Sequence, residues 1–407
     1  MYSRVMSFIQ KYNILYENQF GFQKGMSTEF AINALVNNIV HCLENKETGY
    51  CIFLDFAKAF DTVNHQILLK KLEYYGIRGT ALKWFTSYLS NRMQCTEIGS
   101  TQSNLDYIKC GVPQGSILGP LLFLLYINDI VLSSNVFKFN LFADDTSLFY
   151  SNSNQTEATE IINRELDNIS QWLAANKLSL NVGKSKLLVF NKKKDFNCDL
   201  NIQLNGQILK EVDHAKYLGV LVDNKLSWNF QINAVKLKLA KGTGLLAKIR
   251  HFVPKDTLKS LYFSFVNPYI DYNLLNWGMA SATELEAINL KMKKSVRILS
   301  FKDKYYHSTP LFKELKILPL AQFIEFKYCK FMWKLMNQIL PPSIASNFSI
   351  NDRNQLFTSI SRLKSLSNFV LFAGPVFWKK LPASVSSQTS LDTFSKKLKE
   401  LMLEQLN

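Results

Sequence analysis

Three aspartates stand beside apolar segments, where an unpaired carboxylate is costly to bury. Asp55 follows the apolar run of residues 50–54, and Asp144 and Asp145 are adjacent between the apolar arms of residues 137–150. Neighbouring carboxylates repel each other in a low dielectric, and a divalent cation relieves that repulsion. If the two segments lie side by side, Asp55 and Asp144 can share two Mg²⁺ ions, an arrangement that activates a hydroxyl and stabilises a leaving phosphate. Taken singly, each aspartate could equally be an ordinary turn residue.

The elements that must position these carboxylates follow from apolar periodicity. Residues 50–54 predict a buried strand, and residues 137–150 predict a hairpin with the acidic pair at its tip. Helices are expected within 1–45, around 67–75 and 82–89, and over 116–130 and 157–175; Gly76 is a predicted C-cap, and Asp61 a predicted N-cap or polar-face residue. Short strands are expected near 93–99, 104–110, 186–190, 200–209 and 215–223. This succession predicts an α+β fold in which one antiparallel sheet carries helices on one face.

Composition narrows the class of protein. Of 407 residues 47% are hydrophobic, which excludes wholesale disorder, and the net charge is +16, almost all of it beyond residue 222. Such an excess suggests a polyanionic partner, either nucleic acid or an acidic membrane surface. The six cysteines are scattered, so we expect neither a disulfide scaffold nor a zinc module: Cys42, Cys51, Cys95, Cys110, Cys198 and Cys329. The longest oily stretch, residues 121–127, is too short to span a bilayer and no signal peptide is recognised, so an intracellular protein is expected.

Three short motifs in a fixed order resemble one family. Residues 54–63 (LDFAKAFDTV) look like polymerase motif A of the reverse transcriptases of non-LTR, LINE-type and jockey-like retrotransposons. Residues 111–120 (GVPQGSILGP) and 142–145 (FADD) look like their motifs B and C. Each fragment alone is weak, but their order and element context make the resemblance specific. Flanking segments resemble the stretch before motif A (19–28), motif D (172–190) and the motif E primer grip (217–220), and looser likeness continues through 267–278 and 374–382.

The resemblance implies RNA-directed DNA synthesis by nucleotidyl transfer. Asp55, Asp144 and Asp145 would be catalytic metal ligands for two Mg²⁺ ions, with Mn²⁺ as a substitute, and Lys184 would protonate the pyrophosphate. The implied nucleotide-binding residues are Phe56, Ala59, Phe60, Gln114 and Gly115, and the implied primer grip is Leu218 and Gly219.

Several of these residues have plainer interpretations. Phe60, the implied steric gate against a ribose 2′-hydroxyl, could be a core aromatic, and residues 111–115 could be a surface loop. Lys184 could be a solvated loop lysine, and Gly219 a hairpin glycine. The lysines beyond residue 230 could simply solvate helix faces. They also suit a thumb that follows a duplex backbone with an affinity that falls steeply with salt.

The implied architecture is a right-hand polymerase with partial fingers in 1–50, a palm in 51–223, a thumb-like basic helical region in 224–300 and a C-terminal helical extension in 301–407. RNA template, DNA primer, their duplex and dNTPs are the implied partners, and the family implies a nuclear and cytoplasmic location. The chain departs from the family pattern where the fingers begin, since Gln23 stands where relatives usually carry Arg. We therefore expect an N-terminally truncated enzyme, and the alternative is a catalytically silent remnant that only binds nucleic acid.

Overall fold

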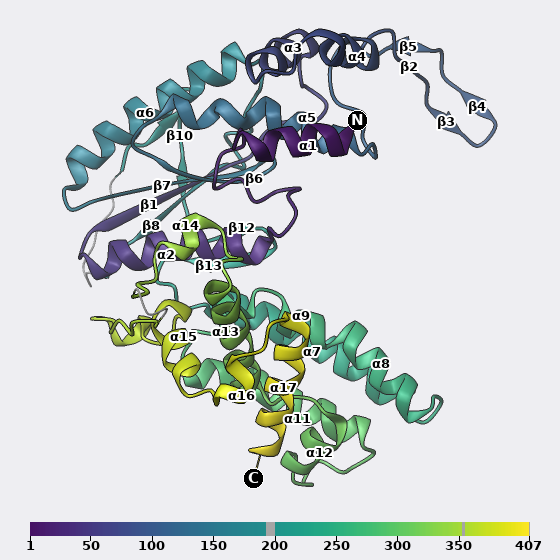
Figure 1. Cartoon of the computed structure of the whole chain (residues 1–407), viewed down its shortest axis with the longest axis vertical. Coiled ribbons are helices and arrows are strands. Elements are labelled where there is room, and N and C mark those ends of the chain that lie inside the picture. Colours follow the sequence, from purple (N-terminus) through teal and green to yellow (C-terminus); the bar gives the residue numbers. More distant parts are fainter. Residues whose placement is uncertain (193–199, 352–354, 407) are drawn as a thin grey trace. The chain divides into compact units, whose positions relative to one another are not determined.

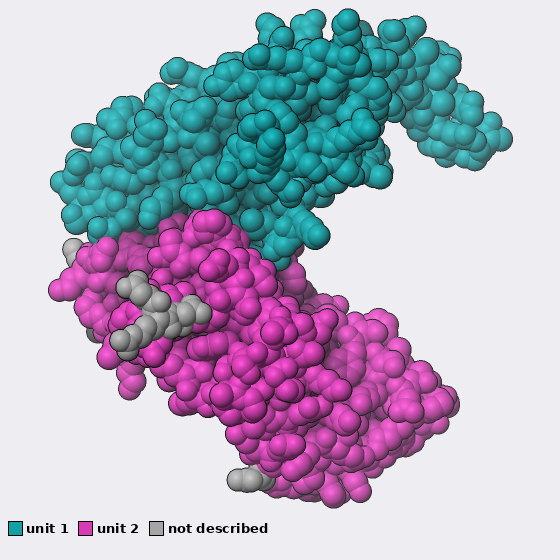
Figure 2. Space-filling view, viewed as in Figure 1, with its two compact units in different colours: residues 1–31, 47–212 teal, residues 32–46, 213–407 magenta. Residues whose placement is uncertain are grey.

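The computed structural model describes residues 1–192, 200–351 and 355–406. It divides into two compact units, one made of residues 1–31 and 47–212 and the other of residues 32–46 and 213–407 (Figure 2). Cys42, Cys51 and Cys329 are buried and Cys95 and Cys110 are exposed, while Cys198 lies outside the described residues. Among the described helices, none is both long enough and apolar enough to cross a membrane.

A five-stranded sheet with the order β11-β8-β1-β7-β6 forms the base of the first unit. Its strands are β1 (Thr48–Leu54), β6 (Lys138–Phe142), β7 (Asp145–Asn152), β8 (Lys186–Phe190) and β11 (Lys210–Glu211). The central strand β1 is buried along its whole length, which explains why its sequence is a continuous apolar run. It pairs antiparallel with β7 and β8, so the predicted buried strand and predicted hairpin are neighbours.

Helices α5 and α6 lie over one face of this sheet (Figure 1). The helices of the first unit are α1 (Tyr2–Lys11), α3 (His65–Tyr74), α4 (Gly79–Leu89), α5 (Leu118–Ile127) and α6 (Gln155–Ala175), and the 3-10 helix η1 (Asn128–Ser133) follows α5. Helix α5 is apolar all round and correspondingly buried. Helix α6 buries Ile162, Leu166, Ile169 and Leu173, as its periodicity predicts. Tyr50, Ile52 and Leu54 of β1 belong to the same core.

The predicted single antiparallel sheet is wrong in its last strands. Strand β11 runs parallel to β8, and β9 (Gln203–Leu204) and β10 (Gln207–Ile208) form a separate ribbon. Strands β12 (His214–Tyr217) and β13 (Val220–Asp223) pair only with each other and belong to the second unit. Sequence patterns show where the chain is extended, but in strands of two to four residues they do not specify the partner.

The ends of helix α3 illustrate one correction and one confirmation. Asn64, rather than Asp61, is the N-cap, because its side chain accepts a 3.1 Å hydrogen bond from the Ile67 N–H. Asp61 is exposed in the preceding turn. At the other end Gly76 takes a left-handed conformation (φ 94°), and the Ile77 N–H reaches the Leu72 carbonyl at 2.9 Å, which closes the helix as predicted.

A narrow ribbon follows α4 and extends away from the rest of the first unit (Figure 1). Strand β2 (Met93–Gln94) pairs with β5 (Asp106–Tyr107), and β3 (Glu97–Ile98) pairs with β4 (Thr101–Gln102). The two strands predicted near 93–99 and 104–110 are therefore present as an interrupted antiparallel hairpin, and all of its strand residues are exposed.

The second unit is mostly helical. Helix α2 (Thr28–Glu44) belongs to this unit from residue 32 onward. The other helices of the unit are α7 (Asn229–Ile249), α8 (Lys255–Phe265), α9 (Asn267–Asp271), α10 (Leu274–Trp277), α11 (Ala282–Leu299), α12 (Thr309–Leu315), α13 (Leu320–Met336), α14 (Pro342–Ala345), α15 (Val370–Lys379), α16 (Ala383–Ser386), α17 (Leu391–Glu404) and the 3-10 helix η2 (Lys364–Leu366). Helices α7 and α11 pack together, with a buried 2.9 Å hydrogen bond between the Thr243 and Ser295 hydroxyls. A Cβ at Gly242 would lie 2.5 Å from the Phe265 carbonyl oxygen, so glycine is what lets α8 approach α7 this closely.

Candidate functional site

The three predicted catalytic carboxylates gather at one end of the sheet. Asp55 comes directly after β1, Asp144 lies in the two-residue turn between β6 and β7, and Asp145 begins β7. Leu54 pairs with Thr146, so one further step of the same register sets Asp55 beside Asp145. Asp55 and Asp144 are half-buried and Asp145 is exposed.

Electrostatics confirm that these carboxylates influence one another. Partial burial and then the charge of Asp55 raise the pKa of Asp144 above its usual value. Desolvation of its carboxyl group raises the pKa of Asp145 as well, although the residue as a whole is exposed, and the charges of Asp144 and Asp55 add to the effect. Asp144 and Asp145 are therefore harder to ionise in the presence of their charged neighbours, which is the condition that a bound cation relieves.

A side chain from the N-terminal segment braces the acidic turn. The Gln19 side chain is buried, and its Oε1 accepts hydrogen bonds from the backbone N–H groups of Ala143 (3.1 Å) and Gly21 (2.9 Å). Residues 18–20 also pair with Leu141 of β6 through backbone hydrogen bonds of 2.7 and 2.9 Å. A Cβ at Gly21 would lie 2.5 Å from the Ala143 nitrogen, so only glycine fits against the turn. Sequence reasoning marked this segment as a polar turn but gave Gln19 and Gly21 no role.

The loop before β8 brings Lys184 into the neighbourhood of Asp55. The Asn181 N–H donates to the Asp55 carbonyl at 2.7 Å, and the Asp55 N–H donates to the Ser185 hydroxyl at 3.2 Å. Lys184 is exposed and directly precedes Ser185 in this loop. The loop is therefore tied to the Asp55 backbone on both sides of Lys184, by the Asn181 backbone on one side and the Ser185 side chain on the other.

The three other predicted residues of motif A differ in exposure. Phe56 and Ala59 are buried, and Phe56 bridges to Leu180 through its backbone. The half-buried Phe60 ring stacks on Phe123 of α5, with 4.3 Å between ring centroids, and meets the edge of Phe22 at 6.3 Å. These contacts fix the Phe60 ring. They agree both with a steric gate and with a core aromatic residue.

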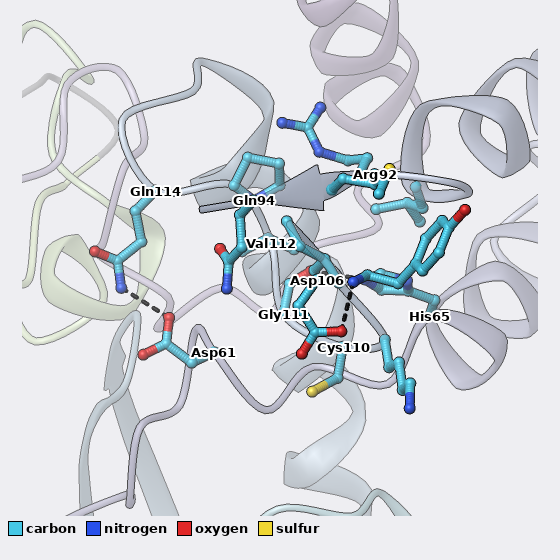
Figure 3. A pocket seen from close by; sticks show the side chains of 15 residues that line it. Asp61, His65, Arg92, Gln94, Asp106, Cys110, Gly111, Val112 and Gln114 are labelled. Atoms are coloured by element: carbon cyan, nitrogen blue, oxygen red, sulfur yellow. Dashed lines mark hydrogen bonds between the residues drawn. The ribbon is translucent and has the colours of Figure 1, made fainter. Parts of the chain in front are cut away.

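Motif B leads from motif A into helix α5. The Gly111 and Val112 N–H groups donate to the carbonyls of Val63 (2.8 Å) and Phe60 (2.9 Å), and Asn64 forms a β-bridge with Cys110. Gln114 is exposed, and its amide donates to Asp61 Oδ1 at 2.8 Å (Figure 3). Gly115 next to it has φ 79° with open space around it, which leaves room for a ligand to approach the backbone.

The predicted primer grip belongs to the second unit and is described by itself. Leu218 (φ 45°) and Gly219 (φ 79°) form the two-residue turn between β12 and β13. The Tyr272 hydroxyl donates to the Leu218 carbonyl at 2.7 Å, and a Cβ at Gly219 would lie 3.4 Å from the Tyr272 ring. Tyr272 is a second bracing residue that local sequence patterns do not reveal.

The donor set suits a cation that is held jointly with a substrate. Within the residues that the structure describes, no group of three or more His, Cys, Asp or Glu side chains is arranged to hold a metal ion on its own. Protein sites for Mg²⁺ that act on nucleotides usually supply one or two carboxylates, while substrate phosphates and water supply the rest. The mutually repelling Asp55 and Asp144 are a pair of this kind.

Known proteins resemble this chain over most of its length. The chain is 26% identical over 331 residues to the probable RNA-directed DNA polymerase from transposon BS of Drosophila melanogaster, covering 77% of this chain and 36% of that protein. It is 28% identical over 338 residues to the RNA-directed DNA polymerase from mobile element jockey of the same organism, covering 80% of this chain and 36% of that protein. The chain thus spans about a third of the length of these relatives. Among solved structures, apo telomerase from Candida tropicalis aligns with a TM-score of 0.42 and 11% identity over 76% of this chain and 52% of that chain.

The family match covers the segments that carry the predicted motifs. The match to the family described as reverse transcriptase (RNA-dependent DNA polymerase) extends over residues 1–222. This range includes the three carboxylates, the Gln114 loop and the Lys184 loop, and it amounts to more than half of the chain. The chain belongs to the reverse transcriptase family.

Proposed function

We propose that this chain copies RNA into DNA by nucleotidyl transfer at Asp55, Asp144 and Asp145. The observation that carries this proposal is the gathering of three carboxylates whose charges oppose one another at the end of the sheet. Two Mg²⁺ ions held there would neutralise the substrate phosphates and lower the pKa of the attacking hydroxyl. The primer 3′-oxygen forms a bond to the α-phosphorus of a dNTP, the bond from the α-phosphorus to the bridging oxygen breaks, and pyrophosphate leaves.

Residues around the carboxylates would orient the substrates. Phe56 and Ala59 would contribute through their backbones, and Gln114 with Gly115 would lie under the incoming nucleotide and the template base. The exposure of Gln114 and the open space at Gly115 support this assignment. Lys184 would donate a proton to pyrophosphate, supported by the backbone bonds that tie its loop to Asp55.

The second unit supplies features suited to the primer and the duplex. Leu218 and Gly219 would hold the primer end, on a turn fixed by Tyr272. Helix α7 exposes Lys238, Lys241 and Lys248 along its outer side, which suits contact with a duplex backbone. Such binding weakens steeply as salt is raised.

Primer extension tests the proposal directly. With Mg²⁺, an RNA template, a DNA primer and dNTPs, the wild-type chain should extend the primer, and Asp144→Asn should reduce the rate by more than about 100-fold, because removing one charge-stabilising group costs on the order of 10²–10³. Asp167→Asn, which removes an exposed carboxylate from α6, should leave the rate unchanged. A wild-type chain that binds the duplex but does not extend it would instead identify a silent remnant.

Sugar selection tests Phe60. If its ring blocks the ribose 2′-hydroxyl, Phe60→Ala should admit ribonucleotides, while Phe60→Tyr should still exclude them. The stack on Phe123 holds the ring in place in the wild type. Unchanged selectivity in Phe60→Ala would leave Phe60 as a core residue only.

A further inference from the structure

Helix α4 and the residues after it carry a partly exposed stack of two aromatic rings and a guanidinium group. The rings of Trp84 and Tyr88 are 5.3 Å apart at an interplanar angle of 10°, and the guanidinium carbon of Arg92 lies 5.7 Å from the Tyr88 ring centroid. The spacing of four residues places Trp84 and Tyr88 on one side of α4. Arg92 lies beyond the end of the helix and extends the row through its contact with Tyr88. Trp84 is 39% exposed even though its indole is one of the largest apolar side chains. This row is a preformed surface for stacking flat groups.

The row joins two grooves of the first unit. A cleft of about 790 Å³ is lined by Leu89, Arg92, Gly111 and Gln114 among others, and Figure 3 labels Arg92, Gly111 and Gln114 among its lining side chains. A second groove of about 420 Å³ is lined by Trp84 together with Arg4 and Arg78. Both volumes fall in the range of ligand sites, roughly 300–1,000 Å³. A continuous path therefore leads from motif B along α4 to two arginines.

The segments beside this path are rich in cations, although the cleft itself is lined by two acids, Asp61 and Asp106, and two bases, Arg92 and Lys109. Residues 1–16 and 62–96 contain seven Lys and Arg against a single acid, Glu73. Lys71 is engaged by Asp129 at 2.5 Å, which leaves six cations on these segments. The net charge of residues 1–222 is nevertheless close to zero, because acidic residues elsewhere in that range, including the three proposed catalytic carboxylates, offset these cations.

We propose that this row and its two grooves hold the unpaired RNA template strand before it is copied. The proposal rests on the proposed function, because the cleft begins at Gln114, where the templating base would lie. Unpaired bases expose π-faces that stack on aromatic rings, and their phosphates pair with Arg and Lys, whereas a duplex hides its base faces. Trp84 takes one base, and Arg4, Arg78 and Arg92 take phosphates on either side. The strand is RNA because the relatives of this chain are RNA-directed polymerases.

Primer extension on two matched substrates tests the path. One RNA template carries a single unpaired nucleotide beyond the primer end, and the other carries about 12, within the ~4–16 nucleotides of known single-strand sites. For the long overhang, Trp84→Ala should raise KM about tenfold, the effect of losing one base–aromatic stack. For the short overhang it should leave KM and kcat unchanged, and Trp84→Phe should behave nearly as the wild type.

Tyr74→Ala is the matched control, because Tyr74 is an 81% exposed aromatic residue of the same unit that lines neither groove. It should leave both substrates unaffected. Equal losses on both substrates in Trp84→Ala, or no loss on either, would overturn the proposal. A third outcome would also overturn it: the wild type sediments as a dimer, Trp84→Ala sediments as a monomer, and KM of the variant still depends on overhang length. The row would then bind a second copy of this chain rather than the template.

A binding measurement separates this proposal from the proposed function. Fluorescence anisotropy of labelled single-stranded RNA without dNTPs should show weaker binding in Trp84→Ala, and Arg92→Gln should reduce the salt slope by about 0.7. If the wild type binds RNA in this Trp84-dependent way but never extends a primer, the catalytic proposal fails and the path stands. If it extends primers normally while Trp84→Ala binds RNA as well as wild type, the path fails and the catalytic proposal stands.

Discussion

Two hairpin turns of this chain do similar structural work with different means. The turn between β6 and β7 carries Asp144, and the turn between β12 and β13 is the proposed primer grip. Each has two residues, and each begins with a non-glycine residue of positive φ, Ala143 at 56° and Leu218 at 45°. Each is also held by a side chain from a distant segment, Gln19 for the first, 124 residues away, and Tyr272 for the second, 54 residues away.

The two turns differ in their second residue and in the side chains that brace them. In the primer-grip turn the second residue is Gly219, which adopts φ 79° without strain, and both positive angles match the hairpin turn that suits twisted strands. Ala143 and Leu218 each keep a left-handed conformation that costs roughly 1–2 kcal/mol. Such strain persists only where the surroundings enforce it. The Gln19 brace is buried and accepts from two backbone N–H groups, whereas the Tyr272 brace is exposed and makes one hydrogen bond, so we expect the acidic turn to depend on its brace more than the primer-grip turn does.

Gly21→Ala should break the comparison most strongly. The new Cβ would lie 2.5 Å from the Ala143 nitrogen and 3.0 Å from the Phe142 carbonyl carbon, and backbone atoms cannot yield cheaply. We expect a loss of about 2–3 kcal/mol in unfolding free energy, typical of overpacking, together with most of the extension activity. Gly244→Ala is the control, because its Cβ would meet nothing within 4 Å on helix α7, and it should be neutral or stabilising by up to ~1 kcal/mol. If Gly21→Ala unfolds at the same denaturant concentration as the wild type, the contact between Gly21 and the acidic turn is loose enough to accept a methyl group.

Gln19→Leu should have the next largest effect. It removes the acceptor of two backbone N–H groups and leaves both unsatisfied in a buried place, at a cost of about 1–3 kcal/mol. Because the turn that carries Asp144 is then free to shift, the Mg²⁺ concentration for half-maximal extension should rise more than KM for dNTP. Chemical denaturation and a Mg²⁺ titration measure the two effects. An unchanged Mg²⁺ dependence in a destabilised variant would reduce Gln19 to a structural residue.

Tyr272→Phe probes the brace of the primer-grip turn and should cost less. It removes one hydrogen bond to the Leu218 carbonyl, at a solvent-exposed place where water can replace the donor, so we expect about 0.5–1 kcal/mol. KM for template–primer should rise modestly at constant kcat. Tyr269→Phe, on the neighbouring helix α9, should change neither quantity. A loss as large as that of Gln19→Leu would mean that both turns depend equally on their braces.

Ala143→Gly is the mildest variant and sharpens the comparison. Glycine adopts the left-handed angle without strain, but it loses a buried methyl group and gains freedom in the unfolded chain. These effects nearly cancel, so the unfolding free energy should change by less than about 1 kcal/mol. The variant should also make Gln19→Leu less harmful in a double-mutant cycle. Simple additivity of the two changes would show that strain at Ala143 and the Gln19 brace are unconnected.

Sequence reasoning was most successful where the signal is local. A continuous apolar run ending at Asp55 and two apolar arms around Asp144 predict the strand and hairpin that the structure contains. The braces could not be predicted, because Gln19 is an ordinary polar residue until the fold sets it beside Ala143. Strand partners were missed for the same reason, as β11 shows by its parallel pairing with β8. The net charge of residues 1–222 was also a poor guide, because it averages the cations on the segments of α1, α3 and α4 with acidic residues elsewhere in that range.

The bridge between Asn64 and Cys110 has an evolutionary consequence. It joins the two ends of an excursion that contains α3, α4 and the ribbon. Helix α3 packs on α5 and α4 buries Phe85 and Leu89, whereas the strand residues of the ribbon are exposed. Lengthening a closed loop is cheap, about 0.6 kcal/mol for each doubling. Insertions, deletions or exchanged segments within the exposed ribbon, residues 93–107, can thus accumulate while the acidic end of the sheet keeps its geometry. Members of this family are therefore free to vary the ribbon without rebuilding the end of the sheet that carries the three carboxylates.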